Sequence, residues 1–267
     1  VSIEVPVLPE FINCFFSGNS SGDGGAVYST GTGAMTFTGC VFVDNTASVR
    51  GGALEVSQGS PVVTGCSFYG NSAPGGGVLD GRGSGVFAFT DCTLADNHAD
   101  QGAAFYCGDD GSLILENSLV AFCTGLETFL LAPGLVTTLT CCNLYGNENG
   151  DWVGDIADQL GVNGNITADP LFCDREAQDY HLRNDSPCVA SSPPNEACDQ
   201  IGAYGVACTV EGVQVCCVET ECYLVTESEC TTLGGDWEEE LESCDPNPCG
   251  TPVERVSWGR VKTMFRR

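Results

Sequence analysis

Cysteine is the residue with the richest chemistry in this sequence, which holds 18 of them among 267 residues. Cysteines form disulfides, bind soft metal ions or act as nucleophiles, and their spacing and compartment separate these cases. Six of them lie within residues 216–249, where zinc is the alternative to disulfides. The only histidines are His98 and His181, and neither lies in that span. We therefore expect disulfides, an oxidising compartment and a secreted protein, extracellular or at a cell surface.

The disulfide candidates form two groups. The first surrounds an irregular segment near residues 165–209, where two bridges of undetermined pairing would keep the chain from fraying. Its members are Cys173, Cys188, Cys198 and Cys208. The second group would stabilise a module that is too small to fold by a hydrophobic core alone. Its members are Cys216, Cys217, Cys222, Cys230, Cys244 and Cys249.

Acid–base chemistry has few candidates. A polysaccharide lyase needs an acidic cluster for Ca²⁺ with a basic residue nearby, and a glycosidase needs two carboxylates that flank the scissile bond. The cations of the repeated region are Arg50 and Arg82, and we expect neither to lie beside an aspartate at a matching position. The pair Asp109-Asp110 is typical of a solvated turn, and the histidines lack a serine or cysteine partner for a triad. We predict that the protein is not an enzyme, with a polysaccharide lyase or hydrolase as an alternative.

The charge limits the partners and cofactors. The formal net charge is −27 at neutral pH, whereas nucleic acid and anionic membranes require Lys and Arg for binding. No cofactor is predicted; the 36 acidic residues can bind Ca²⁺ loosely, but the nonapeptide Asp repeat of calcium β-rolls is missing. No apolar run reaches the ~18 residues of a membrane span. The start at Val1 predicts a mature chain after removal of a signal peptide.

The elements that must position these residues follow from an internal repeat. Cys and Asn recur every 26 positions over four units and Phe over the first three, with Leu94 in the fourth, and the phase continues with 25-residue steps into a fifth and a sixth unit. The cysteines are Cys14, Cys40, Cys66, Cys92 and Cys142. Two residues after the first three of them come Phe16, Phe42 and Phe68. Five residues after each cysteine come Asn19, Asn45, Asn71, Asn97 and Asn147.

The repeat predicts the fold. Each unit has a glycine-rich turn followed by a short apolar strand, as in Gly51-Gly52-Ala53-Leu54. Cys and Phe lie two residues apart, so they point to the same side of a strand, which we expect to be the core. One unit cannot bury its apolar side alone, but units stacked about 4.8 Å apart can. The predicted fold class is all-β: a right-handed parallel β-helix of six coils with a small disulfide-rich C-terminal module.

Stacking of the coils would align the repeated asparagines and cysteines in two columns, each with a structural role. The asparagines would form a hydrogen-bonded ladder at one corner, and the cysteines would form a column of buried thiols. Pairing of cysteines between neighbouring coils is a less favoured alternative.

The motifs Phe-x-x-Asn and Gly-Gly-Ala-(Ile/Leu/Val) in residues 11–147 resemble repeats of the polymorphic outer-membrane protein family, within the pectin-lyase-like β-helix class. The resemblance implies a bacterial surface β-helix in a family noted for adhesion, so an adhesin or glycan-binding protein is an alternative function. Residues 165–205 resemble the closing coil of bacterial secreted β-helices. Residues 216–249 are similar to a cysteine-rich module of large secreted bacterial proteins, and the C-terminal residues resemble short sorting signals.

Four segments are therefore expected. Residues 1–164 form β-helix coils, 165–209 a closing coil and disulfide cap, 210–250 the cysteine-rich module and 251–267 a basic tail. The tail holds five cations and one acid, so it complements the acidic rest of the chain.

We expect a structural surface protein whose copies assemble head to tail into a filament, with surface glycans as other partners. The tail would dock on a neighbour, and the alternating N-terminal residues would offer an unpaired strand edge. A tail that folds onto its own body is the alternative. The assembly candidates are Val1, Ile3, Val5, Trp258, Arg260, Lys262, Phe265, Arg266 and Arg267.

Overall fold

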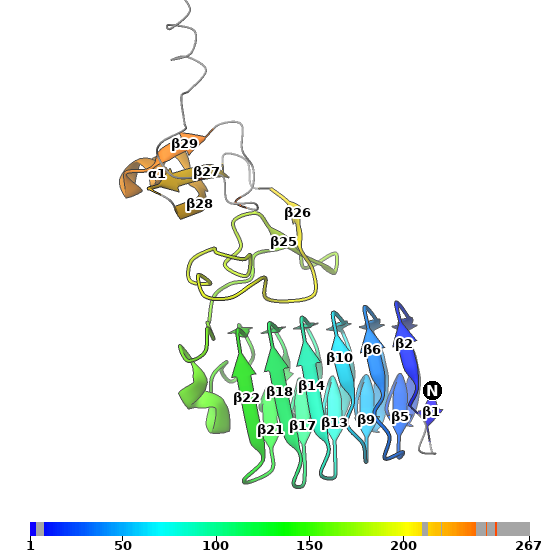
Figure 1. Ribbon diagram of the computed structural model, residues 1–267. Coiled ribbons are helices and arrows are strands. Elements are labelled where there is room, and N and C mark those ends of the chain that lie inside the picture. Colours follow the sequence, from blue (N-terminus) through cyan, green and yellow to red (C-terminus); the bar gives the residue numbers. More distant parts are fainter. Residues whose placement is uncertain (4–7, 210–212, 220, 239–243, 245–248, 250–267) are drawn as a thin grey trace, which may run out of the picture. The chain divides into compact units, whose positions relative to one another are not determined.

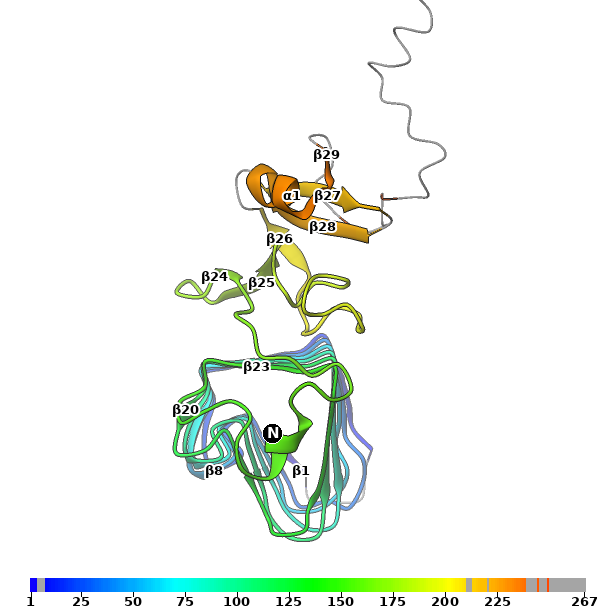
Figure 2. The ribbon, with the colours of Figure 1, turned by 90° about the vertical axis from the view of Figure 1, so that its left-hand side faces the viewer.

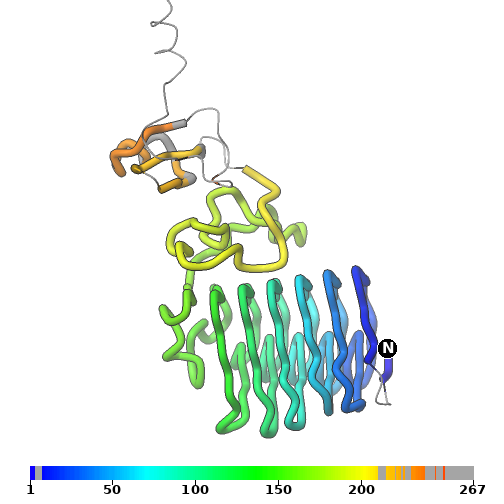
Figure 3. Tube along the Cα trace, in the orientation of Figure 1, coloured from blue at the N-terminus to red at the C-terminus, as the bar shows by residue number. Residues whose placement is uncertain are grey.

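The computed structural model describes residues 1–3, 8–209, 213–219, 221–238, 244 and 249 (Figure 1). The chain divides into two compact units. One contains residues 1–182 and 186–206, and the other contains 183–185 and the described residues from 207 onward. The first unit is the predicted parallel β-helix, and its coils are clear in the tube along the Cα trace (Figure 3). No helix in the described ranges is long and apolar enough to span a membrane.

Four parallel sheets run along the first unit (Figure 2). The first sheet contains β1 (Ser2–Ile3), β5 (Val27–Ser29), β9 (Leu54–Val56), β13 (Leu79–Gly81), β17 (Phe105–Cys107) and β21 (Phe129–Leu131). The second contains β2 (Glu10–Ile12), β6 (Thr36–Thr38), β10 (Val62–Thr64), β14 (Val86–Thr90), β18 (Ser112–Glu116) and β22 (Val136–Thr140). The third contains β3 (Phe15–Ser17), β7 (Val41–Val43), β11 (Ser67–Tyr69), β15 (Thr93–Ala95), β19 (Leu119–Ala121) and β23 (Asn143–Tyr145). The fourth contains β4 (Ser20–Asp23), β8 (Thr46–Arg50), β12 (Ser72–Gly75), β16 (His98–Gln101) and β20 (Thr124–Gly125).

The core consists of stacked identical or similar side chains. Phe16, Phe42 and Phe68 are register partners in the third sheet, and each ring centroid lies 4.6 Å from the next. Phe42 and Phe68 are fully buried. This in-register stacking is what the 26-residue spacing predicts, because each coil can bury its apolar side only against its neighbours.

The corners between strands need a left-handed backbone. One corner column has a positive φ in all six coils, and it consists of Gly18, Asp44, Gly70, Asp96, Phe122 and Gly146. The Gly-Gly turns have a second requirement, because a Cβ on Gly25 would lie 2.1 Å from the carbonyl oxygen of Gly52 in the next coil. Glycine therefore lets neighbouring turns stack at the spacing of the sheets.

The asparagine column forms a hydrogen-bonded ladder from Asn19 to Asn97. Nδ2 of Asn45 donates to Oδ1 of Asn71 at 2.9 Å, and Nδ2 of Asn71 donates to Oδ1 of Asn97 at 3.0 Å. In the fifth coil, for which we predicted no ladder residue, Cys123 takes the position, and its backbone N donates to Oδ1 of Asn147 at 3.0 Å. Asp151 ends the ladder by accepting from Nδ2 of Asn147 at 2.9 Å.

The cysteine column lies beside this ladder, and its members remain free thiols. Backbone N of Cys40 donates to Sγ of Cys66 at 3.2 Å, so the sulfurs also serve as acceptors. Cys14 at the N-terminal coil is half-buried, whereas Cys40, Cys66, Cys92 and Cys142 are buried.

The C-terminal end of the coil stack is covered by a short 3₁₀ helix, η1 (Gly154–Gln159). Ile156 of η1 is buried in the main core. Gln159 serves the last strand of the second sheet: its Nε2 donates to the carbonyl of Thr137 at 3.1 Å, and its Oε1 accepts from the N of Leu139 at 2.9 Å. We predicted that residues 165–205 would form a closing coil. Only the start of that segment lies on this end, where Ile166 pairs in parallel with Asn143 of β23.

The later residues of the first unit, 167–182 and 186–206, form a strap along the outer face of the third sheet. Two of its strands, β24 (Phe172–Asp174) and β25 (Asp179–Arg183), pair antiparallel, so it is not a further coil. The strap is held by backbone N of Gly202, which donates to the carbonyl of Asn117 at 2.8 Å, and by an apolar cluster around Leu119 and Ile201. The unit boundary falls within the third strand of this small sheet, β26 (Val206–Cys208).

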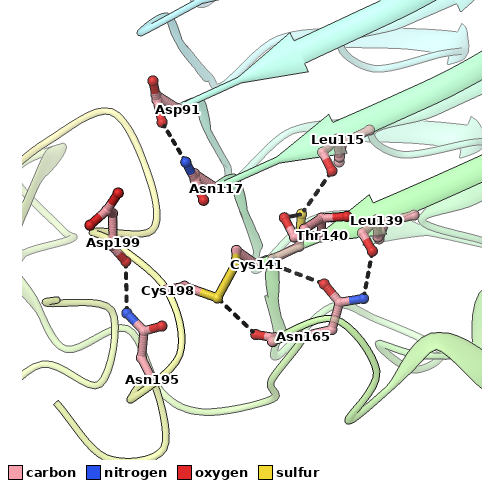
Figure 4. Close-up of a disulfide and its surroundings, with 12 residues drawn as sticks. Asp91, Leu115, Asn117, Leu139, Thr140, Cys141, Asn165, Asn195, Cys198 and Asp199 are labelled. Atoms are coloured by element: carbon pink, nitrogen blue, oxygen red, sulfur yellow. Dashed lines mark hydrogen bonds between the residues drawn. A yellow bond between two sulfur atoms is a disulfide. The ribbon is translucent and has the colours of Figure 1, made fainter. Parts of the chain in front are cut away.

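The disulfides differ from the prediction at this strap. Cys198 pairs with Cys141 at a corner of the sixth coil, a residue that we had not included (Figure 4). Cys188 is a buried free thiol, because it lies under the strap where Nδ2 of Asn143 donates to its sulfur at 3.1 Å. Including Cys188 among the disulfide cysteines was therefore wrong. Cys173 and Cys208 are both disulfide-bonded.

The second unit contains a three-stranded antiparallel sheet and one short helix. Its elements are β27 (Val213–Val218), β28 (Glu221–Thr226), α1 (Glu227–Leu233) and β29 (Asp236–Glu238). Three disulfides staple it, namely Cys216–Cys230, Cys217–Cys249 and Cys222–Cys244. All six cysteines of this module are therefore in disulfides, as its small size predicts.

Candidate functional site: a charged pocket beside the first sheet

A column of polar side chains lies on the outer face of the first sheet. Tyr28, Glu55, Asp80 and Tyr106 are successive register partners at the middle positions of β5, β9, β13 and β17. The residues on either side of Glu55 are in the core, so strand alternation turns this column outward. In-register stacking places the two carboxyl groups on neighbouring strands, about 4.8 Å apart at the backbone.

Two arginines converge on this column. Arg50, at the end of β8, donates from Nε to Oδ1 of Asp23 at 3.0 Å. Arg82 donates from Nε and Nη2 to the two carboxylate oxygens of Asp80, at 2.7 and 3.1 Å, and lies over the ring of Tyr106, 5.1 Å from its centroid.

Our expectation that neither arginine lies beside an aspartate at a matching position is wrong for Arg50, and Arg82 pairs with an aspartate of its own strand. Two physical reasons explain these contacts. Residues 80 and 82 lie two apart, and Arg82 folds back over its own strand onto Asp80. Asp23 and Arg50 are register partners across a bulge between β4 and β8, so their separation of 27 residues escapes a search at 26.

Burial changes the protonation of the carboxyl groups. Glu55 and Asp80 are 0% and 1% exposed, and loss of solvation raises the pKa of both. Hydrogen bonds from Arg82 oppose this effect on the pKa of Asp80. Glu55 accepts from Oγ of Ser57 at 2.7 Å through Oε1, while its buried Oε2 has no hydrogen-bond partner within the described residues.

The surface above the column is a pocket of about 260 Å³. Its lining consists of Val49, Arg50, Pro74, Gly75, Asp80, Arg82, Gln101 and Tyr106. Among the described residues, the guanidinium of Arg50 donates only from Nε, to Asp23, so its remaining N–H groups can donate to a ligand. The pocket can therefore bind a polar or anionic group, and the carboxyl group in its lining, that of Asp80, is bonded to Arg82.

A second charged cluster fixes the strap. Arg175 forms an ion pair with Asp96, the corner residue of the fourth coil, and lies over the ring of Phe122, 3.7 Å from its centroid. The hydroxyl of Tyr180 donates to Oδ2 of Asp96 at 2.9 Å. Every member of this cluster joins the strap to the coils, so its role is structural.

The other residues considered for chemistry lie apart. Asp109 lies in a turn and accepts from the backbone N of Gly83 at 3.0 Å. His98 is exposed, with Nδ1 3.0 Å from Oγ1 of Thr124, and His181 contacts Asp179. Within the described part of the chain, no three His, Cys, Asp or Glu side chains are grouped as metal ligands.

Two of the assembly candidates, Val1 and Ile3, lie among the residues that the structure describes. The terminal amine of Val1 donates to the carbonyl of Ala26 at 2.8 Å, and Ile3 packs into the core. The others lie outside the described residues, namely Val5, Trp258, Arg260, Lys262, Phe265, Arg266 and Arg267.

The comparisons with known proteins agree with this architecture. No curated protein and no solved structure matches the chain. One family does: its model, described as “Right handed beta helix region”, matches residues 7–166, which is more than half of the chain and includes η1 and every strand of the four parallel sheets except β1. The chain thus belongs to the right-handed β-helix family.

Proposed function

We propose that this chain is a structural protein of an extracellular surface or matrix, and that it is not an enzyme. The β-helix fold supports a surface or structural protein, and the many disulfides are typical of an oxidising environment. The single observation that carries the proposal is the burial of Glu55 and Asp80. The two carboxyl groups lie on neighbouring strands, as in a hydrolase pair, yet both are buried and that of Asp80 is bonded to Arg82.

The test is a polysaccharide assay on the full chain. Incubation with polygalacturonate, with and without Ca²⁺, is expected to release neither unsaturated nor reducing ends. Release that disappears in Arg50→Ala or Arg82→Ala would show instead that the pocket is catalytic. Arg183→Ala, in the second unit, is the control for a nonspecific effect of losing an arginine.

Glycan binding at the same pocket is the second candidate function. It is favoured by the free N–H groups of Arg50 and by the half-buried ring of Tyr106, which offer hydrogen bonds and an aromatic contact together. Calorimetric titration with acidic and neutral oligosaccharides tests it. Binding that is lost in Tyr106→Ala but kept in Tyr145→Ala, on the third sheet, supports the pocket as the site, and absence of binding rejects it.

Filament formation is the most specific version of the proposed structural function. Because η1 covers the C-terminal end of the coils, stacking of coils through that end would have to displace Ile156. Docking of the basic tail on the acidic coils of a neighbour is the route that we propose. Electron microscopy of the full chain and of a chain ending at residue 250 separates the outcomes: filaments only with the tail support it, and filaments without the tail, or none at all, contradict it.

A further inference from the structure

The outer face of the second sheet is a regular array of threonine and aliphatic side chains. Register pairing gives two long columns on this face (Figure 1). One column contains Ile12, Thr38, Thr64, Thr90, Glu116 and Thr140. The other contains Glu10, Thr36, Val62, Ala88, Ile114 and Thr138. The wider strands β14, β18 and β22 add Val86, Ser112 and Val136.

These side chains are open to solvent and almost free of charge. Val62, Ile114 and Val136 are 42%, 39% and 66% exposed, although they are apolar. In a chain with 36 acidic residues, this face carries only Glu10 and Glu116, and it has no Lys, Arg or aromatic residue. No hydrogen bond within the described residues occupies the side-chain hydroxyls of its longest threonine column, which are those of Thr38, Thr64, Thr90 and Thr140.

The array is held rigidly. The residues between the two columns point inward and are fully buried, as with Phe37, Phe89 and Leu115. The backbone ladders fix the spacing at about 4.8 Å between strands and about 6.6 Å between alternate residues of one strand. Along the stack the coils lie over one another with little offset (Figure 2). The hydroxyl and methyl groups therefore form a two-dimensional lattice rather than a set of mobile side chains.

The chemistry of this face excludes the usual macromolecular partners. Protein interfaces rely on aromatic and arginine anchors, and this face has none. Nucleic acid and anionic membranes need cations, and glycans stack on aromatic rings, which are equally missing here. A partner that matches a rigid lattice of uncharged hydroxyl and methyl groups must itself be periodic and bind through hydrogen bonds and apolar contact. Ordered water at the surface of ice meets both conditions.

We propose that the second sheet binds ice through its threonine column. The hydroxyls of Thr64 and Thr90 take the place of lattice water, and the methyl groups between them order the water that they cannot bond. Glu116 interrupts the column, because a carboxylate holds its own hydration shell. The interruption gives the proposal a sensitive test, since removing it completes the column without touching the core.

The experiment measures ice-affinity partition and freezing hysteresis of the full chain, with circular dichroism to verify folding. Wild type is expected to concentrate in the ice fraction, Thr64→Tyr to fall to the level of a non-binding control protein, and Glu116→Thr to exceed wild type. Thr46→Tyr places the same bulk on the exposed face of β8 in the fourth sheet and is expected to match wild type.

Three results overturn the proposal: exclusion of wild type from ice, equal loss in Thr46→Tyr and Thr64→Tyr, or no gain in Glu116→Thr. A second copy of the chain is the other partner that could bind such a face. Light scattering on the same samples tests for this dimer. A dimer that Thr64→Tyr dissociates, without any partition of wild type into ice, assigns the face to self-association and rejects ice binding.

Discussion

At the scale of the residue, the interior polar ladder is what fixes the register of the coils. Oδ1 of Asn71 accepts from both the backbone N and Nδ2 of Asn45, at 3.1 and 2.9 Å, and its own Nδ2 donates to the carbonyl of Phe42. Each of these asparagines thus forms hydrogen bonds with polar groups of the neighbouring coils. Replacing one asparagine side chain by alanine leaves several buried donors and acceptors without partners.

Asn71→Ala is therefore expected to lower the free energy of unfolding by about 3 kcal/mol. Asn19→Ala, at the exposed end of the same ladder, is expected to cost less than about 1 kcal/mol. Urea unfolding followed by circular dichroism gives both values. Equal losses in the two variants would mean that the buried ladder contributes no more than its exposed end.

The free thiols differ in reactivity. Burial raises the pKa of Cys66 and of Cys142 to about 12, and only the thiolate is a nucleophile. Of the eight free cysteines, Cys14 alone is not fully buried. A thiol reagent at about pH 8, below the raised pKa of the buried groups, is therefore expected to modify one cysteine in the native protein and eight after unfolding. Cys14→Ser should abolish the native reaction; rapid modification of several thiols would contradict it.

Glu55 makes stability depend on pH. Its pKa is raised in the folded protein by burial, so the unfolded chain loses the proton first as the pH increases. Stability is expected to fall as the pH rises above the ordinary glutamate value, and Asp80 acts in the same direction. Urea midpoints measured from about pH 4 to about pH 8 should decline less in Glu55→Gln than in wild type. Glu116→Gln, on an exposed position, should follow wild type, and identical slopes for all three would refute the assignment.

At the scale of the element, the strap is the part that the repeat does not specify. Its disulfide closes a separation of 57 residues, and the ion pair of Arg175 with Asp96 bridges 79. The double variant Cys141→Ser/Cys198→Ser is expected to lose about 4 kcal/mol of stability, as the entropy of such a loop predicts. Hydrogen exchange should rise at Gly202 and Ala203, whose amides bond to the coils. Unchanged exchange there would show that the strap is held without its disulfide.

The coils could be predicted from the sequence because each residue contacts its equivalent in the neighbouring coil, at a constant sequence spacing. Spacing of 26 residues is enough to place Cys40 beside Cys66 and Asn45 beside Asn71. The strap could not be predicted in this way, since its partners depend on tertiary packing and carry no period. The pocket was missed for a related reason: a bulge moves Arg50 one position out of the repeat.

At the scale of the whole molecule, η1 decides whether the C-terminal end of the coils is open. Ile156→Asp is expected to detach this cap and expose the edge of β22, so that molecules associate end to end. Val153→Asp is the matched control, because Val153 precedes η1 and is already 44% exposed. Light scattering should show larger species for Ile156→Asp only. A monomeric Ile156→Asp protein with intact secondary structure would mean that the edge is protected by something other than η1.

The strap also fixes the number of coils between its points of contact. It touches Tyr69 in the third coil, Asp96 in the fourth and Cys141 in the sixth, so these coils must keep their number and order. The second coil makes none of these contacts. Deletion of residues 40–65 would join Gly39 to Cys66, the same dipeptide as Gly65-Cys66, and bring Cys14 against Cys66. Length can therefore be gained or lost in whole coils before the strap begins, and only there, without redesign of either end.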